Sequence, residues 1–189
     1  MQITEPAEYA MLGLLQSQPM HGYELFQQFQ KGILSQIVHL EMSQMYAFLK
    51  KLERMGYIEA QLEEQGPRPP RKVFHITDAG QQTFARWLTE PLVRPREIRI
   101  LFLIKLYFVQ RSIPRETTRL IEQQIVACRA FLEQLEARHV PQTAAEPLSD
   151  DVFFDLVVLR ERIYQTRSLL AWLQELLHDL VAPSGRDNA

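Results

Sequence analysis

The sequence predicts a mainly α-helical protein with a small β-wing. We expect a winged helix-turn-helix domain followed by a C-terminal helical dimerisation domain. Three observations predict this fold. Apolar residues recur at three- and four-residue steps from Met42 to Met55, two strand-like segments follow directly, and the last third of the chain has a long heptad-like apolar pattern.

The length and composition are those of a globular protein with two small domains. The chain has 189 residues, of which 46% are hydrophobic, enough to form a buried core. Pro91 and Pro95 interrupt the helical pattern. We therefore place the winged helix-turn-helix domain at residues 1–91, the helical domain at 92–182 and a flexible polar tail at 183–189.

Several classes of function find no support in the sequence. The single cysteine, Cys128, lies on an apolar helical stripe and cannot form an internal disulfide. The five histidines lack metal-ligand spacing, and there is no glycine-rich phosphate loop or nucleophile motif. We expect no enzyme, no cofactor and no metal. The N-terminus has no signal-peptide pattern, and the longest apolar run, Ile100–Ile104, is too short for a membrane, so we expect a cytoplasmic protein.

The N-terminal half begins with a predicted helix, a break and a second helix. The first helix is expected over Pro6–Gln16 and the second over His21–Gln30, separated by Ser17–Pro19. Residues Ile33–Leu40 contain β-branched side chains and predict a short strand. A third helix then follows, with its apolar stripe at Met42, Met45, Leu49, Leu52 and Met55.

Gly56 is expected to end this third helix, since glycine is common just past a last helical turn. Strands are predicted over Tyr57–Glu63 and Lys72–Thr77, joined by a loop of Gln65–Arg71 that is rich in proline and arginine. Helix, strand, basic loop and strand in this order are typical of a winged helix-turn-helix, in which the helix enters the DNA major groove.

The polar face of the third helix supplies the candidate DNA contacts. Small or hydrogen-bonding residues near its start suit base edges, and we assign this role to Ser43, Gln44 and Ala47. Phosphate contacts are expected from Tyr46, Lys50, Lys51 and Arg54 on the helix, and from Arg68, Arg71 and Lys72 on the wing. The alternative is an amphipathic helix with solvated lysines followed by an ordinary hairpin.

Net charge does not favour nucleic acid. The chain carries −2, and residues 1–91 hold eight Lys and Arg against ten Asp and Glu. DNA affinity would therefore depend on local placement of charge. The acidic residues Glu59, Glu63 and Glu64 fall on the first predicted wing strand, away from the loop tip.

A helix is predicted over Thr77–Glu90 at the end of the first domain. In the C-terminal region, helices are predicted over Glu97–Gln110, from Pro114 onward and over Ser149–Val181, with a loop at His139–Pro147. Thr77 is a plausible N-cap. The last helix has two neighbouring apolar stripes, which need two partners. One partner can be the Pro114 helix, and a second copy of the chain best supplies the other. The alternative is an intramolecular bundle. We assign dimerisation to Leu156, Leu159, Ile163, Leu170, Leu173 and Leu177.

Aromatic residues near the expected domain junction offer a second candidate site. Trp87, Phe102, Phe108 and Trp172 could line a cavity for a small aromatic effector. Aromatic residues at helical spacing are more often plain core, and the sequence leaves both interpretations open.

A set of motifs resembles the PadR family of bacterial transcriptional regulators. They are Met11–Leu15, Pro19–Leu25, Tyr46–Glu53 with Gly56, Arg68–Lys72, Ile76–Thr77 and Gly80. Their order and spacing also match, over most of residues 9–91, and the long C-terminal region is similar to the branch with several C-terminal helices.

The resemblance implies a winged-helix domain, a helical dimerisation region and a sequence-specific regulator of double-stranded DNA. It implies a homodimer on a pseudo-palindromic operator, usually a ligand-responsive repressor. The start of the second helix would lie near the DNA backbone, which makes Tyr23 a further contact, although Tyr23 could equally pack in the core. Two alternatives stay open: a transcriptional activator of the same family, or an interaction adaptor without DNA binding.

Overall fold

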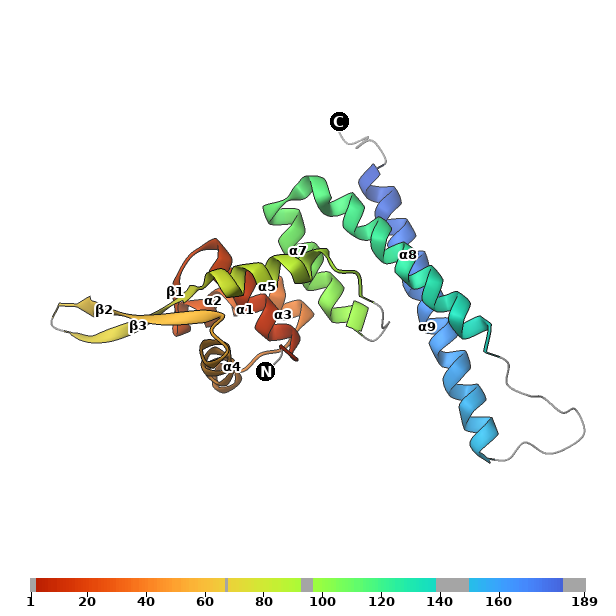
Figure 1. The fold of residues 1–189 in the computed structure, drawn as a ribbon, viewed down its shortest axis with the longest axis horizontal. Helices are drawn as coiled ribbons and strands as arrows, with labels where there is room; N and C mark the ends of the chain where they lie inside the picture. Colours follow the sequence, from red (N-terminus) through yellow and green to blue (C-terminus); the bar gives the residue numbers. More distant parts are fainter. Residues whose placement is uncertain (1–2, 67, 93–96, 139–149, 182–189) are drawn as a thin grey trace, which may run out of the picture. The chain divides into compact units, whose positions relative to one another are not determined.

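The computed structural model describes residues 3–66, 68–92, 97–138 and 150–181. The chain divides into two units, each described separately below (Figure 1). The first unit comprises Met1–Glu90 and Ile100–Arg111, and the second comprises Pro91–Arg99 and Ser112–Ala189. Residues 100–111, which we expected in the C-terminal domain, thus belong to the first unit. The expected loop at 139–147 and the tail at 183–189 lie outside the described residues.

The first unit is built of short helices and a three-stranded sheet. Its elements are α1 (Pro6–Ser17), β1 (Met20–His21), α2 (Gly22–Lys31), α3 (Leu34–Ile37), α4 (Met42–Arg54), β2 (Ile58–Gln65), β3 (Arg68–Ile76), α5 (Asp78–Thr89) and α7 (Leu103–Ser112). A π-helical turn, η1 (Ile98–Phe102), precedes α7. The helices expected at 6–16, 21–30 and 77–90 are confirmed to within two residues, and α4 occupies the expected third position.

The strand expected over residues 33–40 is wrong, because this segment forms the one-turn helix α3. The Ser35 amide and hydroxyl both donate to the Gly32 carbonyl, at 3.4 and 2.9 Å, and Leu34 is fully buried. Local hydrogen bonds and one buried leucine thus override the β propensity of the isoleucines and valine. The strand that does precede α4 is β1, at the break between α1 and α2.

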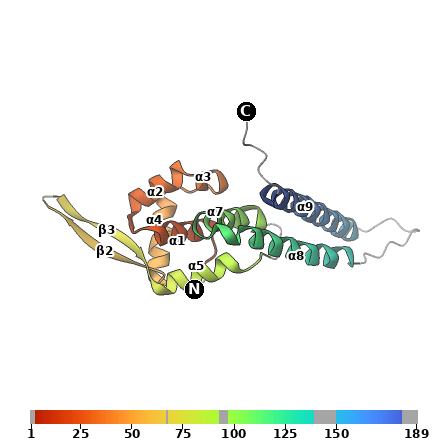
Figure 2. The same ribbon diagram turned by 90° about the horizontal axis from the view of Figure 1, so that it is seen from above.

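The sheet has the order β1–β3–β2 and is antiparallel. The β2–β3 hairpin extends beyond the helices of its unit in both views (Figures 1 and 2). Its strands are longer than predicted, since Pro69 and Pro70 of the expected loop lie within β3. The prolines fall between the Glu63–Arg71 and Gln65–Arg68 pairs, where the register shifts, a position where a missing N–H disrupts little of the ladder.

Both ends of α4 are fixed by hydrogen bonds of its own residues. At the start, the Glu41 amide donates to Gln44 Oε1 at 3.0 Å, forming a capping box. At the end, Gly56 takes a φ of +72°. Gly56 N donates to Glu53 O at 2.9 Å and Tyr57 N to Leu52 O at 3.0 Å, a Schellman motif. Gly56 thus ends the helix as predicted.

The core of the first unit centres on α1, which is buried on nearly all sides. A Cβ atom on Gly13 would lie 2.3 Å from Phe108 Cζ, so α1 and α7 meet at a position where only glycine fits. Phe108 also contacts Phe84 edge-on, with ring centroids 5.3 Å apart. This packing explains why α7 belongs to the first unit. Phe84, Trp87 and Leu88 of α5 are buried, and Thr77 caps α5 as predicted by accepting from Gly80 N at 3.1 Å.

The second unit consists mainly of a long helical pair, α8 (Thr117–Glu136) and α9 (Asp150–Val181), after the short η2 (Pro114–Glu116). The two helices run side by side in both views (Figures 1 and 2). Buried Gln124 of α8 accepts from Leu92 N at 3.0 Å and donates to Leu92 O at 2.7 Å. Cys128 is buried on α8, as expected. None of the described helices is long and apolar enough to cross a membrane.

Candidate nucleic-acid interface

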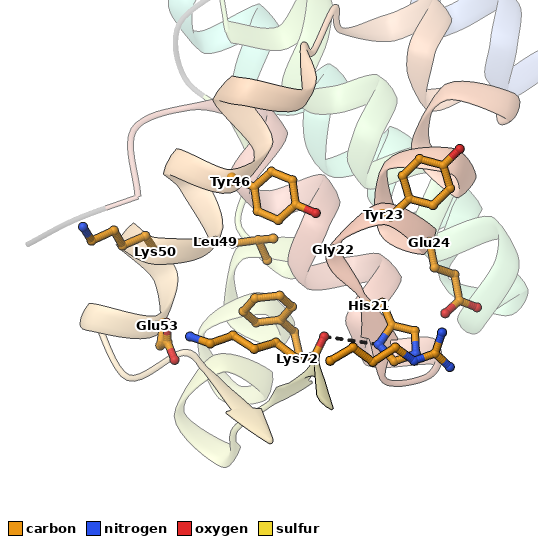
Figure 3. A pocket seen from close by; sticks show the side chains of 11 residues that line it. His21, Gly22, Tyr23, Glu24, Tyr46, Leu49, Lys50, Glu53 and Lys72 are labelled. Atoms are coloured by element: carbon orange, nitrogen blue, oxygen red, sulfur yellow. Dashed lines mark hydrogen bonds between the residues drawn. The ribbon is translucent and has the colours of Figure 1, made fainter. Parts of the chain in front are cut away.

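A groove of about 810 Å³ lies on the first unit between α2, α4 and β3 (Figure 3). Its residues come from the start of α2, one face of α4 and the inner half of β3. They are His21, Gly22, Tyr23, Glu24, Tyr46, Leu49, Lys50, Glu53, Arg71, Lys72 and Phe74. The groove therefore brings together expected contact residues that are up to 49 positions apart in the sequence, from Tyr23 to Lys72.

The exposed face of α4 carries residues expected to meet bases and residues expected to meet phosphates. Ser43, Gln44, Ala47, Lys50 and Arg54 are exposed, whereas the stripe residues between them are buried. Met42, expected on the buried stripe, is 36% exposed, because it occupies the first turn, where the helix leaves the core. Gln44 Oε1 is used in the capping box, so its side-chain nitrogen remains the group suited to donate to a base.

Tyr46 lies across the first turn of α2. A Cβ atom on Gly22 would lie 2.8 Å from Tyr46 Cε1 and 3.1 Å from its hydroxyl, so a glycine at this position lets the ring approach the backbone. Tyr46 is 47% exposed and Tyr23 60% exposed. Tyr23 therefore does not pack in the core, and its hydroxyl accepts from Gln27 Nε2 at 3.2 Å. Both residues line the groove beside the N-terminal end of α2, where the helix dipole favours an anion. The Tyr46 hydroxyl points toward Gly22, whereas the Tyr23 hydroxyl points away from the other labelled residues (Figure 3).

The inner part of the wing is held by His21 and Glu63. His21 Nδ1 donates to the Lys72 carbonyl at 3.2 Å (Figure 3), because a carbonyl can only accept. Glu63 Oε2 lies 3.6 Å from His21 Nε2 and 3.7 Å from Arg71 Nε. Glu63 and Arg71 are directly paired across the strands, so this acidic residue orders the arginine beside it.

Successive wing residues point to opposite faces of the hairpin. Glu59 and Glu63 pair with His75 and Arg71, so they share the face that does not carry Lys72 and Phe74. Glu59 and Glu63 are thus separated from Lys72, which is exposed, whereas Glu64 lies at the register shift and is not paired by this register. Arg68 opens β3, and the placement of its side chain lies outside what the structure describes.

Lys51 does not occupy the exposed phosphate-facing position that we predicted. Its ammonium lies 2.6 Å from Glu8 Oε1 and donates to Glu8 Oε2 at 2.9 Å and Thr4 Oγ1 at 3.0 Å. The side chain of Lys51 is only 20% exposed and that of Glu8 is fully buried. The sequence could not reveal this pair, because its members are 43 positions apart.

Three of the four aromatic residues proposed for effector binding are core residues of the first unit. Trp87, Phe102 and Phe108 are 7%, 0% and 4% exposed, and none of them lines the groove. Trp172 is half-buried in the second unit. Trp87 stacks on Tyr9, with ring centroids 4.0 Å apart.

Lys105 is a buried cation that sequence reasoning missed. It is 1% exposed, its ammonium donates to the Glu90 carbonyl, and it lies 4.8 Å from the centroid of the Trp87 ring. Burial lowers the pKa of Lys105 to about 8, against an opposing effect of the Glu90 carboxylate. The feature of the sequence that could have revealed it is a lysine within an otherwise strongly apolar predicted helix.

The leucine stripe assigned to dimerisation faces α8 instead. Leu173 is fully buried, and Leu156, Leu159, Ile163, Leu170 and Leu177 are half-buried within the single chain, on the helix that packs against α8. Thr166 interrupts the stripe without an unpaired hydroxyl, since it donates to Arg162 O at 2.7 Å. The exposed apolar residues of α9 lie elsewhere and include Phe153, Phe154, Val157 and Val158. The stripe is thus largely covered within the single chain, and its role in dimerisation stays a prediction.

The described residues contain no group of three or more His, Cys, Asp or Glu side chains that could hold a metal ion. What the first unit does contain is an exposed helix, a two-stranded wing and a groove between them with tyrosines and lysine. This fold and surface define a winged helix-turn-helix DNA-binding protein.

The chain belongs to the PadR-like family of transcriptional regulators. The family model described as "Transcriptional regulator PadR-like family" matches residues 11–86, and a model described as "Virulence activator alpha C-term" matches residues 98–180. The negative transcriptional regulator PadR of Bacillus subtilis is 30% identical over 173 residues, covering 90% of this chain and 94% of that protein. These matches confirm the predicted fold class and a regulator rather than an enzyme.

Further relatives have the same character. A probable transcriptional regulator of Mycobacterium tuberculosis is 28% identical over 189 residues, covering 91% of this chain and 96% of the relative. Among solved structures, Bacillus subtilis PadR in complex with operator DNA is 28% identical, with 94% and 99% of the two chains covered and a TM-score of 0.46. The complex of that protein with p-coumaric acid has 27% identity, 93% and 99% coverage and a TM-score of 0.42.

Proposed function

We propose that this regulator binds a pseudo-palindromic operator as a homodimer, with one α4 helix in each of two successive major grooves. The observation that carries the proposal is the exposed face of α4 beside the groove that joins it to α2 and the wing. Ser43, Gln44 and Ala47 would meet base edges. Because operator DNA lies in the cytoplasm of a bacterial cell, the protein would act there.

Phosphates would contact residues around the groove and on the wing. Tyr23, Tyr46 and Lys50 line the groove, and an anion there would also face the free amides of α2. Arg54 at the end of α4 and Arg68, Arg71 and Lys72 on β3 would extend this contact along the backbone. We leave Lys51 out of the set, because its ammonium is engaged by Glu8.

The second copy would cover the exposed apolar face of α9. Phe153, Phe154, Val157 and Val158 are 50%, 61%, 44% and 45% exposed, and they recur at the spacing of one helical face. Exposed apolar residues in such a cluster are typical of a protein interface. Pairing there would leave the Leu156–Leu177 stripe on α8, as it lies in the single chain.

Regulation by a small aromatic effector is supported by the sequence relationship. The Bacillus subtilis relative, 30% identical over nearly its whole length, has been crystallised with p-coumaric acid. Trp87, Phe102, Phe108 and Trp172 stay our candidates for the effector site. Because the first three are closely packed, binding would have to shift an equilibrium between two arrangements of this core.

Repression is the first candidate for the sign of regulation, since the Bacillus subtilis relative is a negative regulator. Activation is the second, favoured by the match of residues 98–180 to the virulence activator model. A reporter gene under the chain's own operator, measured with and without the protein, separates the two.

Selection of duplexes from random DNA by the purified protein tests the central proposal. We expect enriched sequences with two-fold symmetry and half-sites about one helical turn, roughly 34 Å, apart. Affinity for the enriched duplex should fall steeply with added salt. Failure to enrich any duplex at low ionic strength would contradict the proposal and favour the adaptor.

Arg71 tests the role of the wing. We expect Arg71→Ala to weaken binding to the enriched duplex and to a scrambled duplex alike, and to reduce the slope of log K against log salt by about one for each phosphate that the wing no longer neutralises. Glu63→Gln, which removes the carboxylate beside Arg71, should strengthen binding to both duplexes. An unchanged affinity and slope for Arg71→Ala would remove the wing from the contact set.

A further inference from the structure

A buried carboxylate lies at the start of α1. The side chain of Glu8 is fully buried, and its Oε2 accepts from Thr4 N at 2.9 Å and Glu5 N at 3.1 Å. Two backbone amides alone do not neutralise an ionised carboxylate, and a buried charge needs a partner of opposite sign. The residue that supplies this charge is Lys51.

Lys51 reaches Glu8 from the last turn of α4. Its ammonium makes an ion contact of 2.6 Å with Oε1, which has no directed hydrogen bond, and donates to Oε2 at 2.9 Å. It also donates to Thr4 Oγ1 at 3.0 Å. All three contacts join α4 to the N-terminal end of α1, whose buried residues form the centre of the first unit.

Lys50, the residue that precedes Lys51 on α4, has a different environment. Lys50 is exposed and lines the groove. A lysine side chain cannot serve a buried carboxylate and a DNA phosphate at once, and moving Lys51 to a phosphate would leave Glu8 buried without its cation. The two adjacent lysines therefore have separable roles.

We propose that Lys51, through its ion pair with Glu8, is a specificity-determining positioning residue that fixes the orientation of α4 and makes no phosphate contact. This inference rests on the proposed operator binding. The pair holds the helix at one point along its length, and Ser43, Gln44 and Ala47 are carried by the same helix. Base contacts depend on placement within fractions of an ångström, whereas phosphate contacts tolerate small rotations.

The double variant Glu8→Gln/Lys51→Met tests the proposal without leaving a buried charge. The glutamine that replaces Glu8 can still accept from the amides of Thr4 and Glu5, and the net charge of the chain stays the same because one acid and one base are removed. Lys50→Met is the matched control from the adjacent position. Each protein is titrated over a salt series with the duplex that the wild type enriches and with a scrambled duplex of equal length, and thermal unfolding shows that each is folded.

For the double variant we expect an unchanged salt slope on both duplexes and a loss of about tenfold in the affinity ratio of enriched over scrambled DNA, the size of the effect of one mismatched base pair. For Lys50→Met we expect a shallower salt slope on both duplexes and an unchanged ratio.

Two results would overturn the positioning role of Lys51. One is a salt slope that becomes shallower in the double variant as it does in Lys50→Met, which would make Lys51 a phosphate contact. The other is an unchanged affinity ratio in a folded double variant, which would make the pair a matter of stability alone. If the wild type enriches no duplex, operator binding itself fails, and that result is distinct from both.

Discussion

At the scale of single residues, charge placement decides the chemistry of the first unit. The two neighbouring lysines on α4 have different surroundings, since Lys50 lines the groove and Lys51 pairs with buried Glu8. Periodicity places both on the polar side of the helix, and it cannot tell which one meets a carboxylate 43 positions away. The exposed contact set on α4 was thus predictable from sequence, whereas the buried ion pair depends on the tertiary fold.

Lys105 makes the stability of the protein depend on pH. Its folded-state pKa of about 8 lies below the ordinary value of 10.5, so between these values the unfolded chain binds more protons. Folding stability should therefore rise as the pH increases from about 8 to 10.5, by at most about 1.4 kcal/mol per pH unit. Thermal or urea unfolding at several pH values in this window measures the effect.

The control for this prediction is Lys105→Met, which keeps an unbranched side chain next to Trp87. The pH dependence between about 8 and 10.5 should largely disappear in this variant, because the titrating amine is gone. A wild-type stability that stays flat or falls over this window would show that Lys105 is charged at no cost in the folded protein.

At the scale of elements, the helices were predictable because their signals are local. The spacing of Met45, Leu49 and Leu52, the cap at Thr77 and the stop at Gly56 act within a few residues. The wing was predicted too short, because Pro69 and Pro70 suggest a loop. Their tolerance in β3 depends on a register shift against β2, which no local pattern reveals.

Gly56 tests how far the end of α4 depends on left-handed backbone geometry. Its φ is +72°, and a Cβ atom there would meet nothing within 4 Å, so any cost of substitution is conformational. We expect Gly56→Ala to lower the free energy of unfolding by about 1 kcal/mol. Gly56→Asn should cost less, since asparagine tolerates this region better. Chemical denaturation measures both, and equal stability of all three proteins would contradict the assignment.

At the scale of the whole molecule, one chain leaves an apolar face of α9 open. The sequence predicted two apolar stripes and two partners, and it assigned to the second copy the leucine stripe, which is half-buried or buried in the single chain. The choice depends on which stripe α8 covers, and both stripes are apolar. The leucines face α8, and the phenylalanines and valines are left exposed.

Phe154→Asp tests whether this exposed face forms the dimer. A carboxylate in an apolar interface is costly, so we expect the variant to dissociate at concentrations where the wild type sediments as twice the mass of one chain. Val126→Asp on α8, also at an exposed apolar residue of the second unit, is the control and should leave the mass unchanged. A Phe154→Asp protein that stays dimeric would move the interface to another surface.

The buried Glu8–Lys51 pair also has a consequence for handling the protein. Ions in solution screen charges exposed on a surface far more than charges enclosed in the interior. Concentrated salt should therefore release the regulator from immobilised duplexes, whereas the Glu8–Lys51 pair, and with it the position of α4, should stay intact. Protein eluted in this way from a DNA affinity column should regain full binding as soon as the salt is dialysed away.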